Sequence, residues 1–187
     1  MNKKDVREIL KTAISLFLIC AISAGLLGAV NSVTNEKIAS NAEKAENEAR
    51  MAVLPGAESF EKKTLEDETV YYEGLSGSEK LGYVFTVYSS GYGGKIKLTV
   101  GVGNDGAVTG LTILSINETP GLGMNAKKES FLSQYIGKSG TLSAVKNKTP
   151  GDNEILAITS ATVTSKAVTS AVNEALKLYS TVSGQEE

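Results

Sequence analysis

The stretch KIKLTVGVGNDGAVTGLTILSI, residues 95–116, decides the fold class of this chain. Its two halves, KIKLTVGV and AVTGLTILSI, are rich in β-branched residues with partial alternation of apolar and polar side chains, which is typical of strands. Between them, GNDGA (Gly103 to Ala107) has the glycine, asparagine and aspartate of a hairpin turn. We therefore predict an antiparallel pair of strands here.

Strands are also predicted on the N-terminal side of this hairpin. TVYYEGL (residues 69–75) and KLGYVFTVYSS (residues 80–90) are β-branched and aromatic, and GYGG (Gly91 to Gly94) joins the second of them to residue 95. On the C-terminal side, NAKKESFLSQYIG (residues 125–137) has helical spacing and ends at a glycine. EILAIT (residues 154–159) is a short predicted strand.

A final helix with one apolar face closes the domain. Its apolar face is formed by Val168, Ala171, Val172, Ala175 and Tyr179. This order of elements predicts an α+β fold, in which one domain has a meandering, mainly antiparallel sheet flanked by helices. We place the domain at residues 55–182, with a tail at 183–187.

An apolar run precedes the domain. TAISLFLICAISAGLLGAV, residues 12–30, has no charged residue, and the next charge is Glu36. At a rise of about 1.5 Å per residue, this run is long enough to cross a hydrocarbon core roughly 30 Å thick. Residues 1–11 carry Lys3, Lys4, Arg7 and Lys11, so the positive-inside rule predicts a cytoplasmic N-terminus and an extracytoplasmic domain.

Two other interpretations of the run are weighed. A cleaved signal peptide has a shorter apolar region and a small-residue cleavage site. A lipoprotein signal requires a small residue before the modified cysteine, and Ile19 precedes Cys20. We favour a single transmembrane helix in the lipid bilayer, followed by a helical connector over residues 31–54 that ends at Pro55 and Gly56.

Composition excludes several kinds of chemistry. The sequence has no histidine and one cysteine, and its formal net charge is −2. It therefore has no ligand set for an iron–sulfur cluster, a c-type haem or a cysteine–histidine zinc site, and no Ser–His or Cys–His pair. Redox chemistry would require an organic cofactor. The charge balance gives no reason to expect nucleic acid as a partner.

Three segments carry the candidate site: GYGG, NETPGLGMN (residues 117–125) and ITSATVTSKAV (residues 158–168). The first two are ordinary glycine turns on the simplest interpretation, although Gly121 and Gly123 also permit close backbone approach around an exposed Leu122. The third begins the final helix, and its hydroxyls could simply cap unpaired N–H groups.

Taken together, and in this order behind a single span, these segments resemble the RnfG family, the FMN-binding subunits of the Rnf ion-translocating electron-transport complex. The NqrC proteins of the sodium-pumping NADH:quinone reductase are a more distant resemblance. The family motif Ser/Thr-Gly-Ala-Thr corresponds to Thr159, Ser160, Ala161 and Thr162, and the family's ETPGLG is intact at residues 118–123. The resemblance implies FMN joined through its phosphate to Thr162, attached by a flavin transferase that uses FAD.

The physical chemistry of these segments independently indicates where such a cofactor would lie. The phosphate is expected at the start of the final helix, where unpaired N–H groups and the helix dipole favour an anion, with Lys166 as a nearby cation. Leu122 is the first candidate for contact with the flavin ring, and Tyr92 is the weaker one. The predicted cofactor-binding residues, besides Thr162, are Thr159, Ser160, Ala161, Val163, Thr164, Ser165, Glu118, Thr119, Gly121, Leu122, Gly123, Tyr92 and Gly93.

Two positions depart from the family pattern. Ser160 stands where the family usually has glycine, and Leu156 where it often has aspartate. The missing aspartate bears on how efficiently the transferase acts. Serine fits at position 160 only if the backbone there does not require positive φ.

The resemblance implies an electron-carrier subunit of a ferredoxin:NAD oxidoreductase in a bacterial plasma membrane, with other Rnf-type subunits as partners. A single span without intramembrane charge cannot form an ion path alone. A membrane-tethered sensor or ligand-binding domain without a redox cofactor is the alternative from another class. An extracytoplasmic flavoenzyme of the fumarate-reductase type is the third, but it would need a second catalytic domain.

Overall fold

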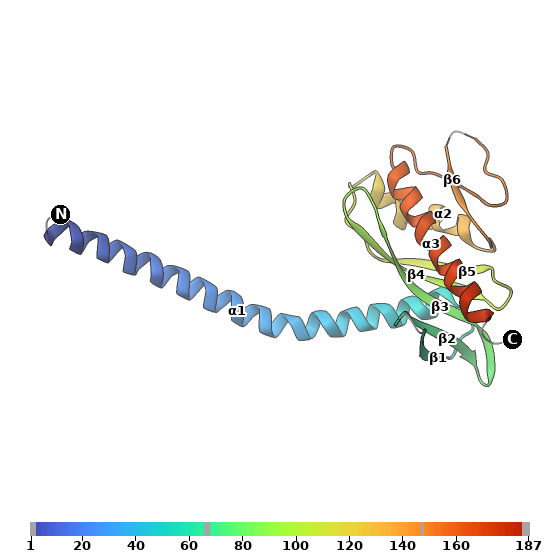
Figure 1. Ribbon diagram of the computed structural model, residues 1–187, viewed down its shortest axis with the longest axis horizontal. Coiled ribbons are helices and arrows are strands. Elements are labelled where there is room, and N and C mark those ends of the chain that lie inside the picture. The colour runs from blue at the N-terminus through green and yellow to red at the C-terminus, as the bar shows by residue number, and fades with distance from the viewer. Residues whose placement is uncertain (1–2, 66–67, 147, 185–187) are drawn as a thin grey trace. The chain divides into compact units, whose positions relative to one another are not determined.

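The computed structural model describes residues 3–65, 68–146 and 148–184. One long helix, α1 (Lys3–Val53), leads into a five-stranded sheet (Figure 1). The strands are β1 (Ser59–Thr64), β2 (Val70–Ser76), β3 (Glu79–Ser90), β4 (Lys95–Gly103) and β5 (Val108–Ser115). The chain then forms η1 (Gly123–Lys127), α2 (Glu129–Leu132), η2 (Ser133–Tyr135), β6 (Ser143–Val145), β7 (Glu154–Leu156) and α3 (Thr162–Ser183).

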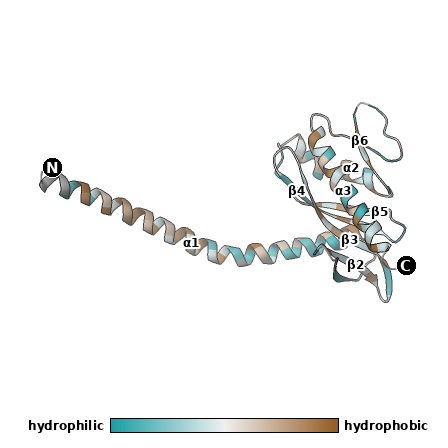
Figure 2. Ribbon diagram, viewed as in Figure 1, coloured by the Kyte–Doolittle hydropathy of each residue, from teal (hydrophilic) through white to brown (hydrophobic). Residues whose placement is uncertain are grey.

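Helix α1 contains the predicted span and the predicted connector without a break. Its residues up to Lys44 form a unit separate from the rest of the chain. The N-terminal half is largely apolar and the second half more polar, as Figure 2 shows by colour. Among the described residues, α1 is the one helix long and apolar enough to cross a membrane.

The sheet follows the predicted meander. Its order is β1-β2-β3-β4-β5, and every neighbouring pair is antiparallel. The predicted hairpin joins β4 to β5, and Gly106 adopts φ +77° in its turn, a conformation that glycine adopts without steric cost. The α+β class with a mainly antiparallel sheet is therefore confirmed.

Two strands escaped prediction because their sequences lack the apolar alternation of a half-buried strand. The residues of β1 are SFEKKT and almost all are exposed, since β1 is an edge strand. Strand β6 has three residues and pairs in parallel with β7 in a separate two-stranded sheet. Such short pairs leave too few positions for a periodic pattern to show.

The single helix predicted over residues 125–137 is wrong. The chain there forms the short segments η1, α2 and η2, because Lys128 has an extended backbone (φ −71°, ψ 138°) that interrupts helical hydrogen bonding. The aromatic residues of this region still reach the core. Phe131 and Tyr135 are buried, and the Tyr135 hydroxyl lies 2.9 Å from the hydroxyl of Thr169 on α3.

Helix α3 covers one face of the sheet. Its buried apolar side chains, such as Val168, Val172 and Ala175, join those of β3 and β4 in the main core. Tyr83 and Phe85 on β3 are fully buried beneath it. Val168, Val172 and Ala175 belong to the apolar face that the sequence predicted for this helix. Burial of these side chains therefore fixes α3 on the sheet. The N-terminal end of α3 lies at the edge of the helix layer.

The last turns of α1 cover part of the opposite face. The compact unit that contains the sheet begins at Ala45, within the segment predicted as the connector. Val53 and Leu54 are buried there with Val84 of β3. A methyl group on Gly101 would lie 2.2 Å from the Val53 carbonyl oxygen. A methyl group on Gly110, which pairs with Gly101, would lie 3.0 Å from the same oxygen and from the Val53 Cα. We call Gly101 and Gly110 the glycine seat.

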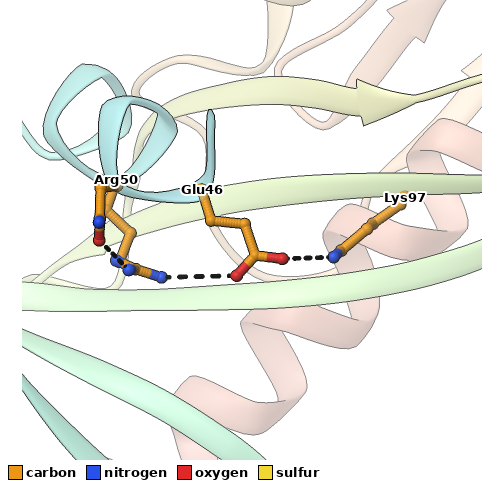
Figure 3. Close-up of polar contacts among 4 residues, drawn as sticks. Glu46, Arg50 and Lys97 are labelled. Carbon is orange, nitrogen blue, oxygen red and sulfur yellow. Dashed lines mark hydrogen bonds and ion pairs between the residues drawn. The ribbon is translucent and has the colours of Figure 1, made fainter. Parts of the chain in front are cut away.

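Polar contacts hold the same helix end. Figure 3 shows Lys97 of β4 directed at Glu46, which also faces Arg50. The Lys97 ammonium lies 2.5 Å from the Glu46 carboxylate, and this hydrogen bond raises the pKa of Lys97. The Arg50 guanidinium lies 4.0 Å from the centre of the Tyr72 ring, within the range of cation–π attraction.

The glycine seat predicts a stability effect. Gly101→Ala should lower the free energy of unfolding by roughly 2–3 kcal/mol, because the new methyl group overpacks a backbone contact that cannot move aside. Thermal unfolding of the full chain in detergent would measure it. Gly151→Ala is the control, since its methyl group meets only Glu154 atoms at 3.6 Å and beyond. Equal melting temperatures for the two variants would show that the seat does not constrain the helix end.

Candidate functional site

The loop before α3 is held by a serine inside the helix. Ser165 is fully buried; its hydroxyl donates to the Ala161 carbonyl and accepts the Ile158 N–H, both at 2.9 Å. The N-cap residue is Ala161, which makes no side-chain cap hydrogen bond. Thr159 and Ser160, which precede it in the loop, are exposed. Helix capping therefore does not account for these two hydroxyls. The Ser165 hydroxyl is used in hydrogen bonds to the loop and does not face a ligand surface.

Ser160 adopts the left-handed conformation, with φ +61°. The condition that we set for serine at this position is thus not met: the backbone keeps the conformation that glycine would adopt freely. A non-glycine residue there costs about 1–2 kcal/mol. The turn is retained because the surrounding hydrogen bonds impose it, among them Ala161 N–H to the Ile158 carbonyl at 3.0 Å.

Glu118 joins the two glycine-rich segments. Its carboxylate is buried, and Oε1 accepts N–H groups of Tyr92 at 2.7 Å and Gly93 at 3.2 Å. A methyl group on Gly91 would lie 2.2 Å from Oε1, and one on Gly123 would lie 2.6 Å from Oε2. A side chain at either position would therefore displace the carboxylate from its present place.

These segments and the start of α3 enclose one cavity of about 510 Å³. Exposed apolar side chains of Tyr92, Leu122 and Val163 lie on its walls. Ten of the predicted site residues line it: Tyr92, Glu118, Thr119, Leu122, Gly123, Ser160, Ala161, Thr162, Val163 and Thr164. We call it the apolar cavity.

A second cavity, of about 910 Å³, adjoins the first. Thr159, predicted for the site, lines this one, which also contains Lys146 and Lys148; we call it the lysine cavity. Both cavities share Lys146, Ser160 and Thr162. The Thr162 side chain therefore lies at the boundary between them. Leu156, one of the two departures from the family pattern noted in the sequence, is exposed and lines the lysine cavity.

The remaining predicted residues lie outside both linings. Gly93 contributes through its hydrogen bond to Glu118, and Gly121 has φ +77°, which shapes the loop that presents Leu122. Lys166, the lysine expected near the phosphate, lines neither cavity, whereas Lys146 lines both. Sequence analysis missed Lys146 and Lys148 because they lie on a separate loop with no motif. Lys148 pairs with Glu154 at 2.5 Å, a contact that lowers the pKa of Glu154.

The arrangement fits a flavin mononucleotide. The N-terminus of a 22-residue helix offers N–H groups and a positive dipole end to a phosphate, and Lys146 adds a cation beside Thr162. The apolar cavity offers side chains on which a planar ring can rest.

Comparison with known proteins agrees with this geometry. The FMN-binding domain family matches residues 91–177, and the RnfG N-terminal region matches residues 1–53. The class is thus a flavin-binding protein with one candidate membrane helix among its described residues.

Relatives of the whole chain give the family. The chain is 37% identical to the G subunit of the proton-translocating ferredoxin:NAD(+) oxidoreductase complex of Clostridium ljungdahlii, over 97% of both chains. It is 38% identical to the corresponding G subunit of the Na(+)-translocating complex of Acetobacterium woodii, over 96% of this chain and 95% of the relative. The chain therefore belongs to the RnfG family.

A solved structure shares the fold. The crystal structure of Shewanella oneidensis NqrC superposes with a TM-score of 0.54 at 22% identity, over 68% of this chain and 67% of the other. The family resemblance seen in the three sequence segments is confirmed.

The strained turn predicts a stabilising substitution. Ser160→Gly should raise the free energy of unfolding by about 1 kcal/mol, because glycine adopts positive φ without steric cost. Ser170→Gly on the exposed face of α3 is the control and should lower it by about 0.5 kcal/mol, since glycine weakens a helix interior. Thermal unfolding in detergent compares the two, and a loss of stability in both variants would contradict a strained Ser160.

Proposed function

We propose that this chain is the electron-carrying flavoprotein subunit of an Rnf-type ferredoxin:NAD oxidoreductase complex in a bacterial plasma membrane. FMN is joined by a phosphoester to Thr162, and the other subunits of the complex are its partners. The observation that carries the proposal is the place of Thr162, at the N-terminus of α3 and at the boundary of the two cavities. Family membership supports it, and the match to an FMN-binding domain counts against a sensor without a cofactor.

The residues of the chain have distinct tasks in this proposal. The N–H groups at the start of α3 and the Lys146 ammonium bind the phosphate, and the walls formed by Tyr92, Leu122 and Val163 orient the ring. When bound, FMN supplies the electron-transfer chemistry that the side chains lack. A ring held at an open cavity can exchange electrons with neighbouring subunits without leaving its site.

Attachment of the flavin requires a second protein. A threonine hydroxyl is a weak nucleophile at neutral pH, and the sequence has no histidine to activate it. We propose that a flavin transferase uses FAD as donor. The Thr162 oxygen bonds to the phosphorus on the flavin side, the bond from that phosphorus to the bridging oxygen breaks, AMP leaves, and the hydroxyl proton passes to the transferase.

Substitution of the acceptor tests the attachment. Thr162→Val keeps the shape of the side chain but removes its oxygen, so covalent flavin should fall from the wild-type level to none while the domain still folds. Peptide mass spectrometry and in-gel flavin fluorescence after denaturation measure this, in a host that contains the transferase.

Thr159→Val is the matched control, because Thr159 lies close to Thr162 in the sequence and lines only the lysine cavity. It should keep most of the flavin, and the buried Thr164→Val should keep at least part. Wild-type protein from a host without the transferase should carry none. Flavin phosphate on another residue, or none in a competent host, would sink the assignment.

We also propose that the N-terminus is cytoplasmic and the flavin domain extracytoplasmic. The lysine and arginine residues before the apolar run motivate this orientation. Protease added outside intact spheroplasts should digest the domain, as followed with an antibody to it. A cytoplasmic marker protein must survive in the same sample. If the domain is digested only after lysis, the orientation is the reverse.

A further inference from the structure

The buried carboxylate of Glu118 connects three parts of the site. Through Oε1 it accepts the N–H groups of Tyr92 and Gly93, in the turn between β3 and β4. Its other oxygen faces Gly123 at the start of η1. Gly123 in turn lies against Thr164 of α3, whose hydroxyl oxygen would be 2.8 Å from a methyl group there. One side chain thus links the turn, the loop and the helix.

The turn is tied to the loop by this carboxylate and also by Asn117, whose Nδ2 donates to the Gly93 carbonyl at 3.4 Å. It contains three glycines, which give it more conformational freedom than other residues would. One hydrogen bond inside the turn, from Gly91 N–H to the Gly94 carbonyl at 2.8 Å, closes it. The two bonds to Glu118 tie it to the loop that carries Leu122. Tyr92 is 77% exposed, so the backbone bonds rather than packing hold this residue in place.

The same carboxylate places a charge on the wall of the apolar cavity. Because Glu118 is only 7% exposed, water screens this charge less than it would a surface charge. Reduction adds electrons to a flavin, and it adds negative charge to the ring wherever proton uptake does not follow. A fixed negative charge beside the ring therefore disfavours the reduced form and lowers the midpoint potential.

We propose that Glu118 is a positioning residue that holds the turn of residues 91–94 at the wall of the apolar cavity. We also propose that its charge lowers the midpoint potential of the flavin bound there. This inference rests on the proposed function, because it takes the apolar cavity as the place of the ring. Substitution of Glu118 by glutamine or by alanine separates the positioning effect from the effect of the charge. Glutamine keeps an oxygen that can accept both N–H groups but removes the charge, whereas alanine removes both.

The first measurement needs no flavin. Hydrogen exchange of the Tyr92 and Gly93 amides is followed by NMR in the full chain carrying Thr162→Val, in detergent. Adding Glu118→Ala should speed exchange of both amides about tenfold or more, since they lose a hydrogen bond to a charged acceptor. Adding Glu118→Gln should restore most of the protection. Unchanged exchange in the alanine variant would overturn the positioning role.

The second measurement uses the flavin-loaded full chain. Glu118→Gln should shift the midpoint potential to more positive values, as measured by spectroelectrochemical titration. Glu174→Gln is the control, because it removes the same charge from an exposed position of α3 outside both cavities. Equal potentials in the wild type and Glu118→Gln would overturn the electrostatic role. If mass spectrometry finds no flavin on the chain, the proposed function fails, while the exchange comparison still decides whether Glu118 holds the turn.

Discussion

The contact between the Val53 backbone and the glycine seat is the constraint on which the arrangement of the domain depends. A sheet face that carried side chains at Gly101 and Gly110 could not admit a helix end this closely. With the seat in place, the last turns of α1 cover one face, and the Thr109 hydroxyl donates to the Val53 carbonyl at 2.6 Å. The other face is left for α3. Each face of the sheet is therefore covered by a helix from an opposite end of the chain.

The site is a product of this layering. Helix α3 packs with its apolar stripe on the sheet, so its N-terminus meets the loops that leave β3 and β5. Those loops carry Tyr92 and Leu122, and the Glu118 carboxylate fixes their backbones relative to one another. Charge is distributed unevenly around Thr162: the buried Glu118 carboxylate lines the apolar cavity, Lys148 lines the lysine cavity, and Lys146 lines both. That asymmetry suits a cofactor with an apolar ring at one end and a phosphate at the other.

Features set by local chemistry were predictable from the sequence, and those set by distant contacts were not. The GNDGA turn and the flanking β-branched runs predicted the β4–β5 hairpin, and the apolar stripe of α3 was complete in its own residues. The packing of residues 45–54 on the sheet could not be predicted from the sequence, because it depends on glycines far along the chain, at positions 101 and 110. Lys146 lies on a loop whose sequence has no motif, so its place in the lining of the apolar cavity could not be predicted. At Ser160 the family's usual glycine raised the question of positive φ, but the sequence could not answer it, since serine ordinarily avoids that conformation.

The elements of the domain differ in how far apart in the sequence their contacting partners lie. Strands β1 to β5 pair with their immediate neighbours in sequence, so the sheet closes only short loops as it forms. Helix α3 comes last and must pack back onto β3, which lies far earlier in the chain. The surroundings of Thr162 are complete only when that packing has occurred. Under the proposed attachment, an enzyme that recognises the shape around this threonine would act on folded chains and pass over unfinished ones, so that modification would be a late step in the maturation of the protein.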